Sequence, residues 1–209
     1  MTMDSLYSKH LENAVNEISK LPGIGKRSAL RLALHLVKQD EASVSLLTDR
    51  INKLKSSLMY CRVCHNISDT EVCDICSNPK RNGRLICVVQ DIRDVIAIEN
   101  TGQYNGLYHV LGGVISPVEG IGIQQLTIRQ LFDRVEAGNI DEVILALPAT
   151  VEGDTTNFFI YKNIKDKVPS VTTIARGIGV GEELEYADEI TLGRSILSRT
   201  NFDNSLKTR

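Results

Sequence analysis

The sequence predicts an α/β multidomain protein with four parts: an N-terminal helical hairpin bundle, a small four-cysteine module, a mostly parallel sheet with flanking helices, and a C-terminal extension. Three observations predict this order. Apolar residues recur at helical spacing through residues 11–58, and four cysteines follow in two close pairs. From residue 84 onward, short β-rich runs alternate with helical stretches. We place the parts at residues 1–59, 60–79, 80–175 and 176–209.

Two amphipathic helices are predicted at the N-terminus, separated by a short turn. Leu11, Val15 and Ile18 lie at positions i, i+4 and i+7, and the apolar residues of 30–37 repeat this stripe. Between them runs LPGIGKRSA, residues 21–29. Pro22 cannot continue the first helix, so the chain turns there.

The glycines of this turn predict a phosphate-binding site. Gly23 and Gly25 permit positive φ and close backbone approach, which leaves the first amides of the second helix free. With Lys26 and Arg27 beside them, these amides can hold a DNA phosphate without reading a base. The alternative is an ordinary connection between helices.

A third helix is predicted over residues 43–59, leading directly into the cysteines. Its apolar positions fall on one face, and we expect them to form core or a subunit interface: Val44, Leu47, Ile51, Leu54 and Leu58.

The four cysteines, Cys61, Cys64, Cys73 and Cys76, form a C-x2-C-x8-C-x2-C array. This spacing brings two knuckles face to face and predicts one tetrahedral Zn²⁺ site. Four thiolates leave no open coordination position, so the metal is expected to be structural, one ion per chain. Disulfide pairing and ligation by His65 are the alternatives. Cys87, in the run LICVV, is expected to be a buried strand residue.

The second half predicts a sheet with helices on both faces. Strands are expected at 84–90, 107–111, 142–147 and 170–175, and helices near 92–101, 124–137 and 154–166. The carboxyl ends of such strands carry the functional loops. Those ends hold residues 90–91, 112–122 and 148–156.

Acidic residues at one of these ends have two interpretations. Glu152 and Asp154 offer two carboxylates to a Mg²⁺ ion. Alternatively, the Glu-Gly-Asp turn caps a helix that begins near Thr155. The sequence leaves both interpretations open.

Charge is distributed unevenly along a chain of net charge −2. Residues 1–59 carry nine Lys/Arg and six Asp/Glu, whereas residues 85–209 carry eleven and seventeen. Nucleic-acid contact is therefore expected on the N-terminal part. An acidic run, Glu182 to Glu189, is expected to be solvated or to contact a basic partner or a neighbouring subunit. The absence of a signal-like N-terminus and of long apolar runs predicts a cytoplasmic protein that does not span a membrane.

These motifs in this order resemble the RecR family of bacterial recombination mediators. The resemblance covers essentially the whole chain and includes HVLGGVISPVEGIG, TVEGDTT and IARGIGVGEELEYADEITLGRS. It implies a helix-hairpin-helix at Leu21 to Lys26, a Toprim-type sheet domain, and a nucleoid-associated ring-like tetramer that clamps DNA. It also implies that the protein binds single-stranded, double-stranded and gapped DNA, and cooperates with RecO and RecF in loading recombinase on gapped single strands.

One position departs from the Toprim pattern that the resemblance implies. Glu152 and Asp154 match its acidic pair, but Gln90 stands where the first strand usually ends in glutamate. A neutral amide is neither a practical general base nor a charged Mg²⁺ ligand. We therefore expect a non-enzymatic DNA clamp; the alternative is a metal-dependent Toprim-type phosphodiester enzyme acting on DNA.

Overall fold

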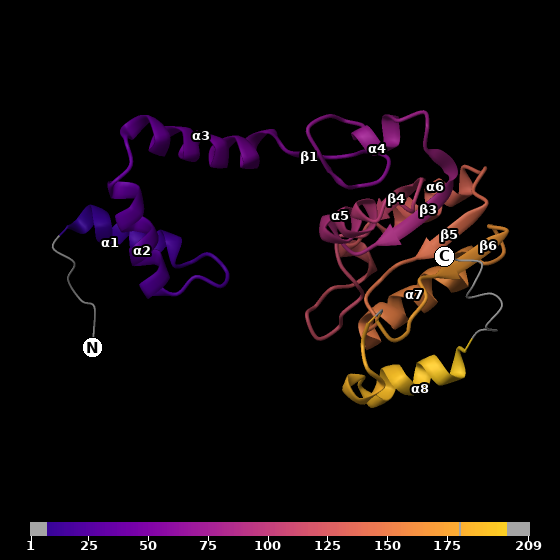
Figure 1. The fold of residues 1–209 in the computed structure, drawn as a ribbon. Coiled ribbons are helices and arrows are strands. Elements are labelled where there is room, and N and C mark those ends of the chain that lie inside the picture. The colour runs from indigo at the N-terminus through magenta and orange to yellow at the C-terminus, as the bar shows by residue number, and fades with distance from the viewer. Residues whose placement is uncertain (1–7, 180, 200–209) are drawn as a thin grey trace. The chain divides into compact units, whose positions relative to one another are not determined.

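The computed structural model describes residues 8–179 and 181–199. The chain divides into two compact units, Met1–Leu58 and Met59–Arg209, which are treated separately below (Figure 1). Among the described residues, no helix is long and apolar enough to cross a membrane.

The first unit contains three helices, α1 (Lys9–Ile18), α2 (Lys26–Val37) and α3 (Glu41–Ser57). Ser8 caps α1 by accepting a hydrogen bond from the Leu11 amide. The predicted stripes pack against each other: Val15 of α1 is buried with Ala29 and Ala33 of α2. The predicted hairpin of two amphipathic helices is therefore confirmed.

Helix α3 differs from the other two in having no buried residue. Asp40 caps it, with an Oδ1 to Ser43 N distance of 2.9 Å. Leu47, Ile51 and Leu54 remain 45%, 57% and 61% exposed. The expectation that this stripe forms core was wrong within the chain; the subunit interface stays a prediction.

The second unit begins with the cysteine module. A two-residue antiparallel pair, β1 (Met59–Tyr60) and β2 (Ile67–Ser68), carries the first knuckle, and the short helix α4 (Asp74–Ser77) carries the second.

A four-stranded sheet follows. It consists of β3 (Asn82–Val89), β4 (Gly106–Val110), β5 (Glu142–Leu145) and β6 (Ser170–Thr173), in the order β4-β3-β5-β6, and every neighbouring pair is parallel. The predicted α/β architecture and its parallel sheet are confirmed.

Helices cover both faces of this sheet (Figure 1). Alternate residues of β3 point to opposite faces, so each face packs against its own helices. Ile86 and Val88 pack with α6 (Ile128–Glu136) and α7 (Val151–Ile164). Cys87 and Val89 pack against α5 (Ile92–Asn100). Cys87 is buried in this strand as expected, and burial raises the pKa of its thiol to about 12.

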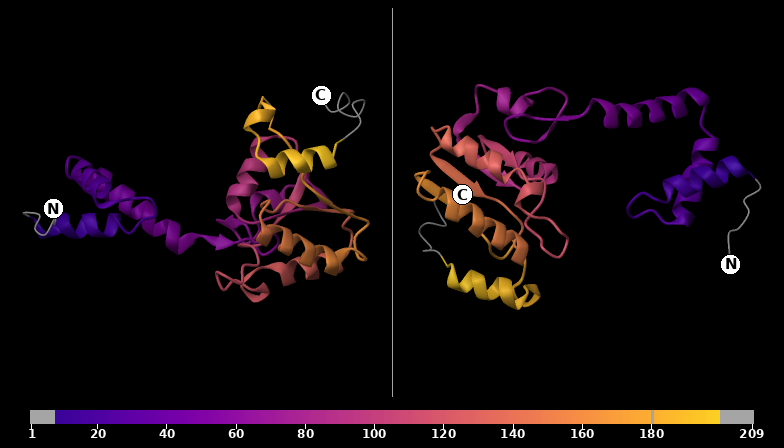
Figure 2. Two further views of the ribbon diagram at one scale, coloured as in Figure 1. Left: turned by 90° about the horizontal axis from the view of Figure 1, so that it is seen from below. Right: turned by 180° about the vertical axis from the view of Figure 1, so that it is seen from behind.

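The remaining elements run to the C-terminal end of the described chain. The 3-10 turns η1 (Ile123–Gln125) and η2 (Leu184–Tyr186) precede α6 and α8 (Glu189–Leu197), respectively. The prediction of one continuous helix at 124–137 was wrong, because Leu126 and Thr127 separate η1 from α6. Figure 2 shows the sheet and its helices from two further directions.

Candidate functional site

The turn between α1 and α2 exposes its backbone. Gly23 has φ +78° and Gly25 caps α2 in an extended conformation, with no side-chain hydrogen bond to the helix. Positive φ is therefore needed at Gly23 but not at Gly25. Gly23, Gly25, Lys26 and Arg27 are all exposed. The first amides of α2 have no capping side chain, so they can donate to an anion.

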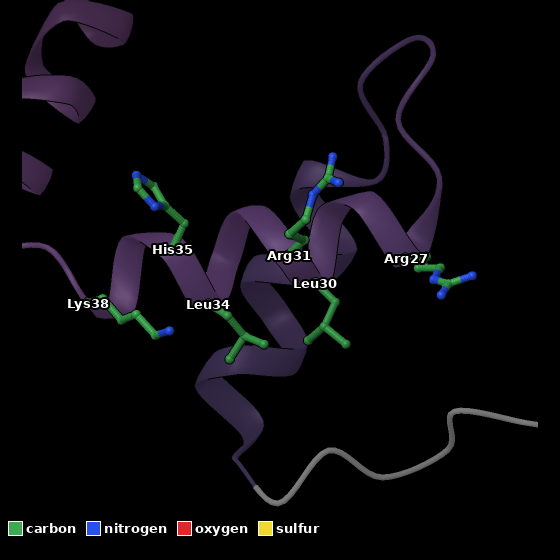
Figure 3. A pocket seen from close by; sticks show the side chains of 6 residues that line it. All are labelled: Arg27, Leu30, Arg31, Leu34, His35 and Lys38. Atoms are coloured by element: carbon green, nitrogen blue, oxygen red, sulfur yellow. The ribbon is translucent and has the colours of Figure 1, made fainter.

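A row of cations continues along α2 from this turn. Arg27, Arg31 and Lys38 line a shallow groove of about 420 Å³ together with His35 and two leucines (Figure 3). Helix α2 carries no acidic residue. Arg31 and Lys38 were missed by motif reasoning, although their spacing of four and eleven residues from Arg27 places them on one helical face.

The four predicted zinc ligands come together. The Sγ atoms of Cys61, Cys64, Cys73 and Cys76 all lie within 4.8 Å of one another, and three of the residues are buried. Tetrahedral Zn–S bonds of about 2.3 Å require Sγ atoms about 3.8 Å apart, and those of Cys64 and Cys73 are 3.5 Å apart. The geometry fits a structural zinc ion and has no disulfide, since all five cysteines are free.

Backbone amides point at one of these sulfurs. The Cys73 amide donates to Cys61 Sγ at 3.4 Å. Burial works against ionisation of Cys61, but hydrogen bonds from backbone amides lower the pKa of its thiol to about 6. By contrast, burial raises the pKa of Cys73 to about 11. A zinc ion would replace the protons that the other thiols retain.

The module is joined to the sheet through its first knuckle. The Val110 amide donates to the Cys64 carbonyl at 2.8 Å. His65 has φ +60°, an unusual value for a residue other than glycine. Its ring meets that of buried His109 edge to face, with centroids 5.2 Å apart. His65 therefore packs against the sheet rather than joining the four thiols.

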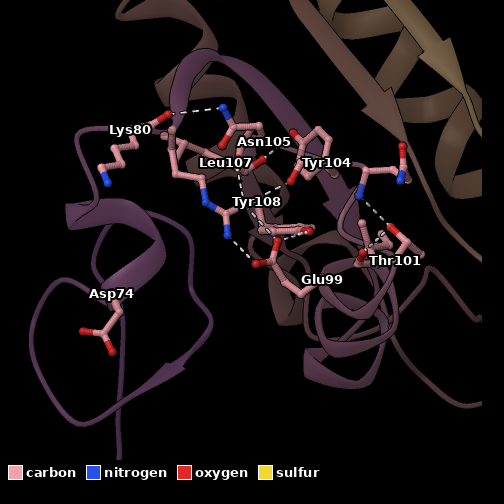
Figure 4. A network of polar contacts seen from close by, with 12 residues as sticks. Asp74, Lys80, Glu99, Thr101, Tyr104, Asn105, Leu107 and Tyr108 are labelled. Atoms are coloured by element: carbon pink, nitrogen blue, oxygen red, sulfur yellow. Dashed lines mark hydrogen bonds and ion pairs between the residues drawn. The ribbon is translucent and has the colours of Figure 1, made fainter.

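A second connection lies just after the module (Figure 4). Arg81 forms a two-pronged ion pair with Glu99 of α5, with an Nη1 to Oε1 distance of 2.9 Å. Tyr108 of β4 donates to the same carboxylate at 2.7 Å. Hydrogen bonding by Arg81 lowers the pKa of Glu99. This network ties the chain that leaves the cysteine module to a helix and a strand of the sheet domain.

Glu152 and Asp154 lie in the first turn of α7, not in a turn before it. Thr150 caps the helix by accepting a hydrogen bond from Gly153 at 3.1 Å, so the expectation of a helix starting near Thr155 was wrong. Asp154 accepts hydrogen bonds from Arg176 at 2.6 and 3.2 Å. Arg194 lies 3.8 Å away. Hydrogen bonding by Arg176 lowers the pKa of Asp154.

No third acid joins this pair in the described part of the chain, where the four cysteines are the one group of three or more metal-ligand side chains. Gln90 follows β3; its carbonyl accepts from the Gly112 amide at 2.9 Å, and its amide donates to Asp94 Oδ2 at 3.0 Å. Asp91 caps α5 by accepting from Arg93 N at 2.7 Å and pairs with the Arg93 side chain. Asp91 therefore has a structural role at the helix start.

The acidic run is partly structural. Asp188 caps α8 by accepting from Thr191 N at 2.9 Å, and Glu182 accepts from Gly179 N at 3.0 Å. The other acids of the run, Glu183, Glu185 and Glu189, are exposed.

These features define a class of protein: a helix-hairpin-helix unit joined to a four-cysteine zinc module and a parallel α/β domain. Family models agree part by part. Residues 11–55 match the RecR helix-hairpin-helix, 58–78 the RecR zinc finger domain with four cysteines, 84–175 the Toprim domain, and 177–200 the RecR C-terminal family.

Curated relatives match over nearly the full length. Recombination protein RecR of Flavobacterium johnsoniae is 59% identical over 200 residues, covering 96% of this chain and 97% of the relative. The protein of the same name from Bacteroides thetaiotaomicron is 59% identical over 196 residues, which cover 94% of this chain and 96% of the relative. That from Porphyromonas gingivalis is 54% identical over 200 residues, which cover 96% of this chain and 97% of the relative. The chain belongs to the RecR family.

Proposed function

We propose that this chain is a DNA-binding mediator of recombinational DNA repair. It acts as an oligomeric clamp and helps to load recombinase on gapped single-stranded DNA together with RecO and RecF type proteins. Membership of the RecR family and the helix-hairpin-helix and zinc finger matches support a role on DNA. Membership of this family also supports a cytoplasmic location, associated with the nucleoid.

The observation that carries this proposal is the start of α2. Exposed amides without a capping side chain, next to Lys26 and Arg27, suit a phosphate. Arg31 and Lys38 extend the cationic row over the eleven residues from Arg27 to the C-cap of α2, or about 16 Å at 1.5 Å per residue. This length allows contact with more than one phosphate of a strand.

We divide the work among four parts of the chain. Within residues 1–59, the turn before α2 and the cations of α2 hold the DNA backbone, and residues 60–79 form a zinc-stiffened neck with Cys61, Cys64, Cys73 and Cys76 as ligands. Residues 80–175 provide a rigid body and a partner surface. Residues 176–209 contact subunits or partners, which the exposed acids of the run Glu182 to Glu189 favour.

The clamp is proposed to bind DNA without catalysing a reaction on it. Gln90 supplies no carboxylate at the end of β3, and Asp154 is paired with Arg176 and Arg194. A Mg²⁺ ion at Glu152 and Asp154 would have to displace both guanidinium groups. These side chains favour a clamp over a Toprim-type phosphodiester enzyme.

A homo-oligomer, which we propose to be a tetramer, would cover the apolar stripe of α3. Leu47, Ile51 and Leu54 are exposed in the single chain, and such a stripe gains stability when a second copy covers it. Light scattering is expected to give a mass about four times the 23.1 kDa of one chain.

The decisive experiment is a DNA-binding titration at several salt concentrations. Changing Lys26, Arg27 and Arg31 together to Gln should weaken binding to any sequence. It should also reduce the slope of log K against log salt by about 0.7 for each lost contact on a single strand. A matched variant changes three exposed cations of α3 instead: Arg50, Lys53 and Lys55.

The α3 variant removes the same charge and is expected to keep the salt slope of the wild type. If both variants lower the slope equally, general charge rather than the turn holds the DNA. An unchanged slope in the α2 variant would contradict the proposal.

A further inference from the structure

A pocket of about 500 Å³ lies beside the zinc module, at the carboxyl ends of β3 and β4. Its walls come from both parts of the second unit. The β1–β2 pair supplies Tyr60 and Ile67, and the ends of the two strands supply Asp91 and Leu111. Ligands of parallel sheets bind at this end of the strands, and no residue of the turn between α1 and α2 belongs to the lining of the pocket.

An apolar platform stands at this pocket. Tyr60 and Ile67 are partners across the β1–β2 pair, so their side chains lie on the same face. Tyr60 is 72% exposed and Ile67 37% exposed. A tyrosine ring that is this exposed to solvent, next to an aliphatic side chain, offers a surface on which a flat ring can stack.

Two amide side chains provide hydrogen-bond donors in the same pocket. The Oδ1 of Asn66 accepts from Ile67 N at 2.9 Å, and the Oε1 of Gln125 accepts from Gly122 N at 2.9 Å. These bonds fix which way each amide faces. Neither NH₂ group donates to another group among the residues that the structure describes, so both remain available to a ligand acceptor.

The charge of the pocket argues against a phosphate. No lysine or arginine belongs to its lining, and its one carboxylate, Asp91, is held by Arg93. An anion would meet this carboxylate without a cation of the lining to offset it. A neutral ring with acceptor atoms on its edge fits better.

We propose that this pocket receives an unpaired nucleobase, which stacks on Tyr60 while its ring acceptors take hydrogen bonds from Asn66 and Gln125. The proposal rests on the proposed DNA binding and adds to it a preference for single strands, since the bases of a duplex are already stacked and paired. An aromatic side chain of a protein partner could stack as well, but it offers at most one acceptor, on Tyr or His, to the two amide donors. The nucleobase therefore satisfies more of the pocket.

The test compares two ligands and three variants of the full chain. The ligands are an oligothymidylate and a strand of equal length whose sugars carry no bases. The variants are Tyr60→Ala, Tyr60→Phe, which keeps the ring, and Phe158→Ala, which removes an aromatic side chain of α7 that is 67% exposed and lies outside the pocket. Zinc content and circular dichroism of each variant verify the fold.

Loss of one stacked base weakens binding by about 5- to 150-fold. Tyr60→Ala should therefore bind oligothymidylate at least about fivefold more weakly, with the salt slope of the wild type because no phosphate contact is lost. The base-free strand should bind wild type and Tyr60→Ala equally. Tyr60→Phe and Phe158→Ala should match the wild type on both ligands.

Three results would overturn the proposal. Tyr60→Ala could bind oligothymidylate as the wild type does, it could lose the same affinity for the base-free strand, or it could keep DNA binding and lose a protein partner instead. If the wild type binds neither ligand, the proposed function falls as well. If the α2 cation variant loses salt slope while Tyr60→Ala is unaffected, the nucleobase pocket alone is wrong.

Discussion

Arg176 donates two hydrogen bonds to the carboxylate of Asp154, at 2.6 and 3.2 Å. Arg176 follows β6, whereas Asp154 lies in the first turn of α7, so this pair joins the segment after the sheet to a helix that covers it. Arg194 of α8 adds a second cation 3.8 Å from the same carboxylate. Asp154 thus holds the C-terminal segment in place.

Asp154→Asn is expected to loosen residues 177–199 without unfolding the sheet. Both side chains of the Arg176 pair are about a third exposed, so the loss in stability should be small, about 1 kcal/mol or less. Hydrogen exchange should be faster in this segment alone. Arg176→Ala leaves Arg194 beside Asp154, so its effect should be equal or smaller, and the double variant should add little to Asp154→Asn because the Arg176 pair is already lost there.

Glu152→Gln is the matched control, since it neutralises the other acid of this turn without touching Arg176. It should leave the exchange of residues 177–199 unchanged. A segment that exchanges at the wild-type rate in Asp154→Asn would show that packing, not the ion pair, holds it.

The sequence was sufficient where the signal is local. Two C-x2-C knuckles must converge to bind one metal, so their spacing predicted the cluster of Sγ atoms. Likewise, the alternation of short apolar β-rich runs with helical stretches predicted a parallel sheet with helices on both faces. The start of α7 was misplaced near Thr155, because the Glu-Gly-Asp turn was one of two candidates for the residues before the helix, whereas Thr150 provides the cap.

Long-range pairs could not be predicted in this way. Arg176 and Asp154 are 22 residues apart in the chain, and no periodicity relates them. The pocket beside the zinc module likewise depends on how β1 and β2 pack against the ends of β3 and β4. Such relationships arise only once the elements are folded together.

The ion pair of Arg81 and Glu99 should make stability depend on acid pH. Its side chains are 14% and 29% exposed, and Arg81 lowers the pKa of Glu99 below its usual value of 4.5. The unfolded chain then binds the proton more tightly than the folded one. This contribution is present above about pH 4.5 and is lost as the pH falls through the lower folded pKa.

Glu99→Gln should lower the free energy of unfolding at pH 7 by about 1–2 kcal/mol, between the values for an exposed ion pair and for a buried hydrogen bond to a charged group, and this free energy should then fall less steeply below pH 4.5. Urea titrations at a series of pH values measure both effects. Glu119→Gln, at an exposed loop position, serves as the control and should keep the wild-type profile. An equally steep acid fall in Glu99→Gln would assign the dependence to another carboxylate.

Gly153 is required by a close approach inside the first turn of α7. A Cβ added there would lie 2.0 Å from the carbonyl oxygen of Pro148, which is backbone and cannot move aside easily. Gly153→Ala should destabilise the protein by about 1–3 kcal/mol, although alanine favours helix. In contrast, Gly193→Ala in α8 meets nothing within 4 Å and should be neutral or stabilising by up to about 1 kcal/mol. Thermal unfolding of the two variants compares them directly, and equal stability would contradict the clash.

Zinc is expected to stabilise the knuckles rather than the sheet. The cysteine module has a small core of its own around Cys61, Cys64 and Cys73, too few apolar residues to fold without the metal. The sheet is held by a separate core that includes Ile86, Leu131 and Ile160. Removing the metal should therefore open residues 61–76 while most of the α/β domain survives.

Metal analysis should give one zinc per wild-type chain and almost none in Cys73→Ser. Limited proteolysis of Cys73→Ser should cut within residues 61–76 and leave a stable fragment that contains the sheet. Cys87→Ala removes a cysteine from β3, outside the cluster, and should keep full zinc content even if its cavity lowers stability. Zinc retained at one per chain in Cys73→Ser, or lost in Cys87→Ala, would mean that the four thiols are not the ligand set, because a closed tetrahedral site needs all four.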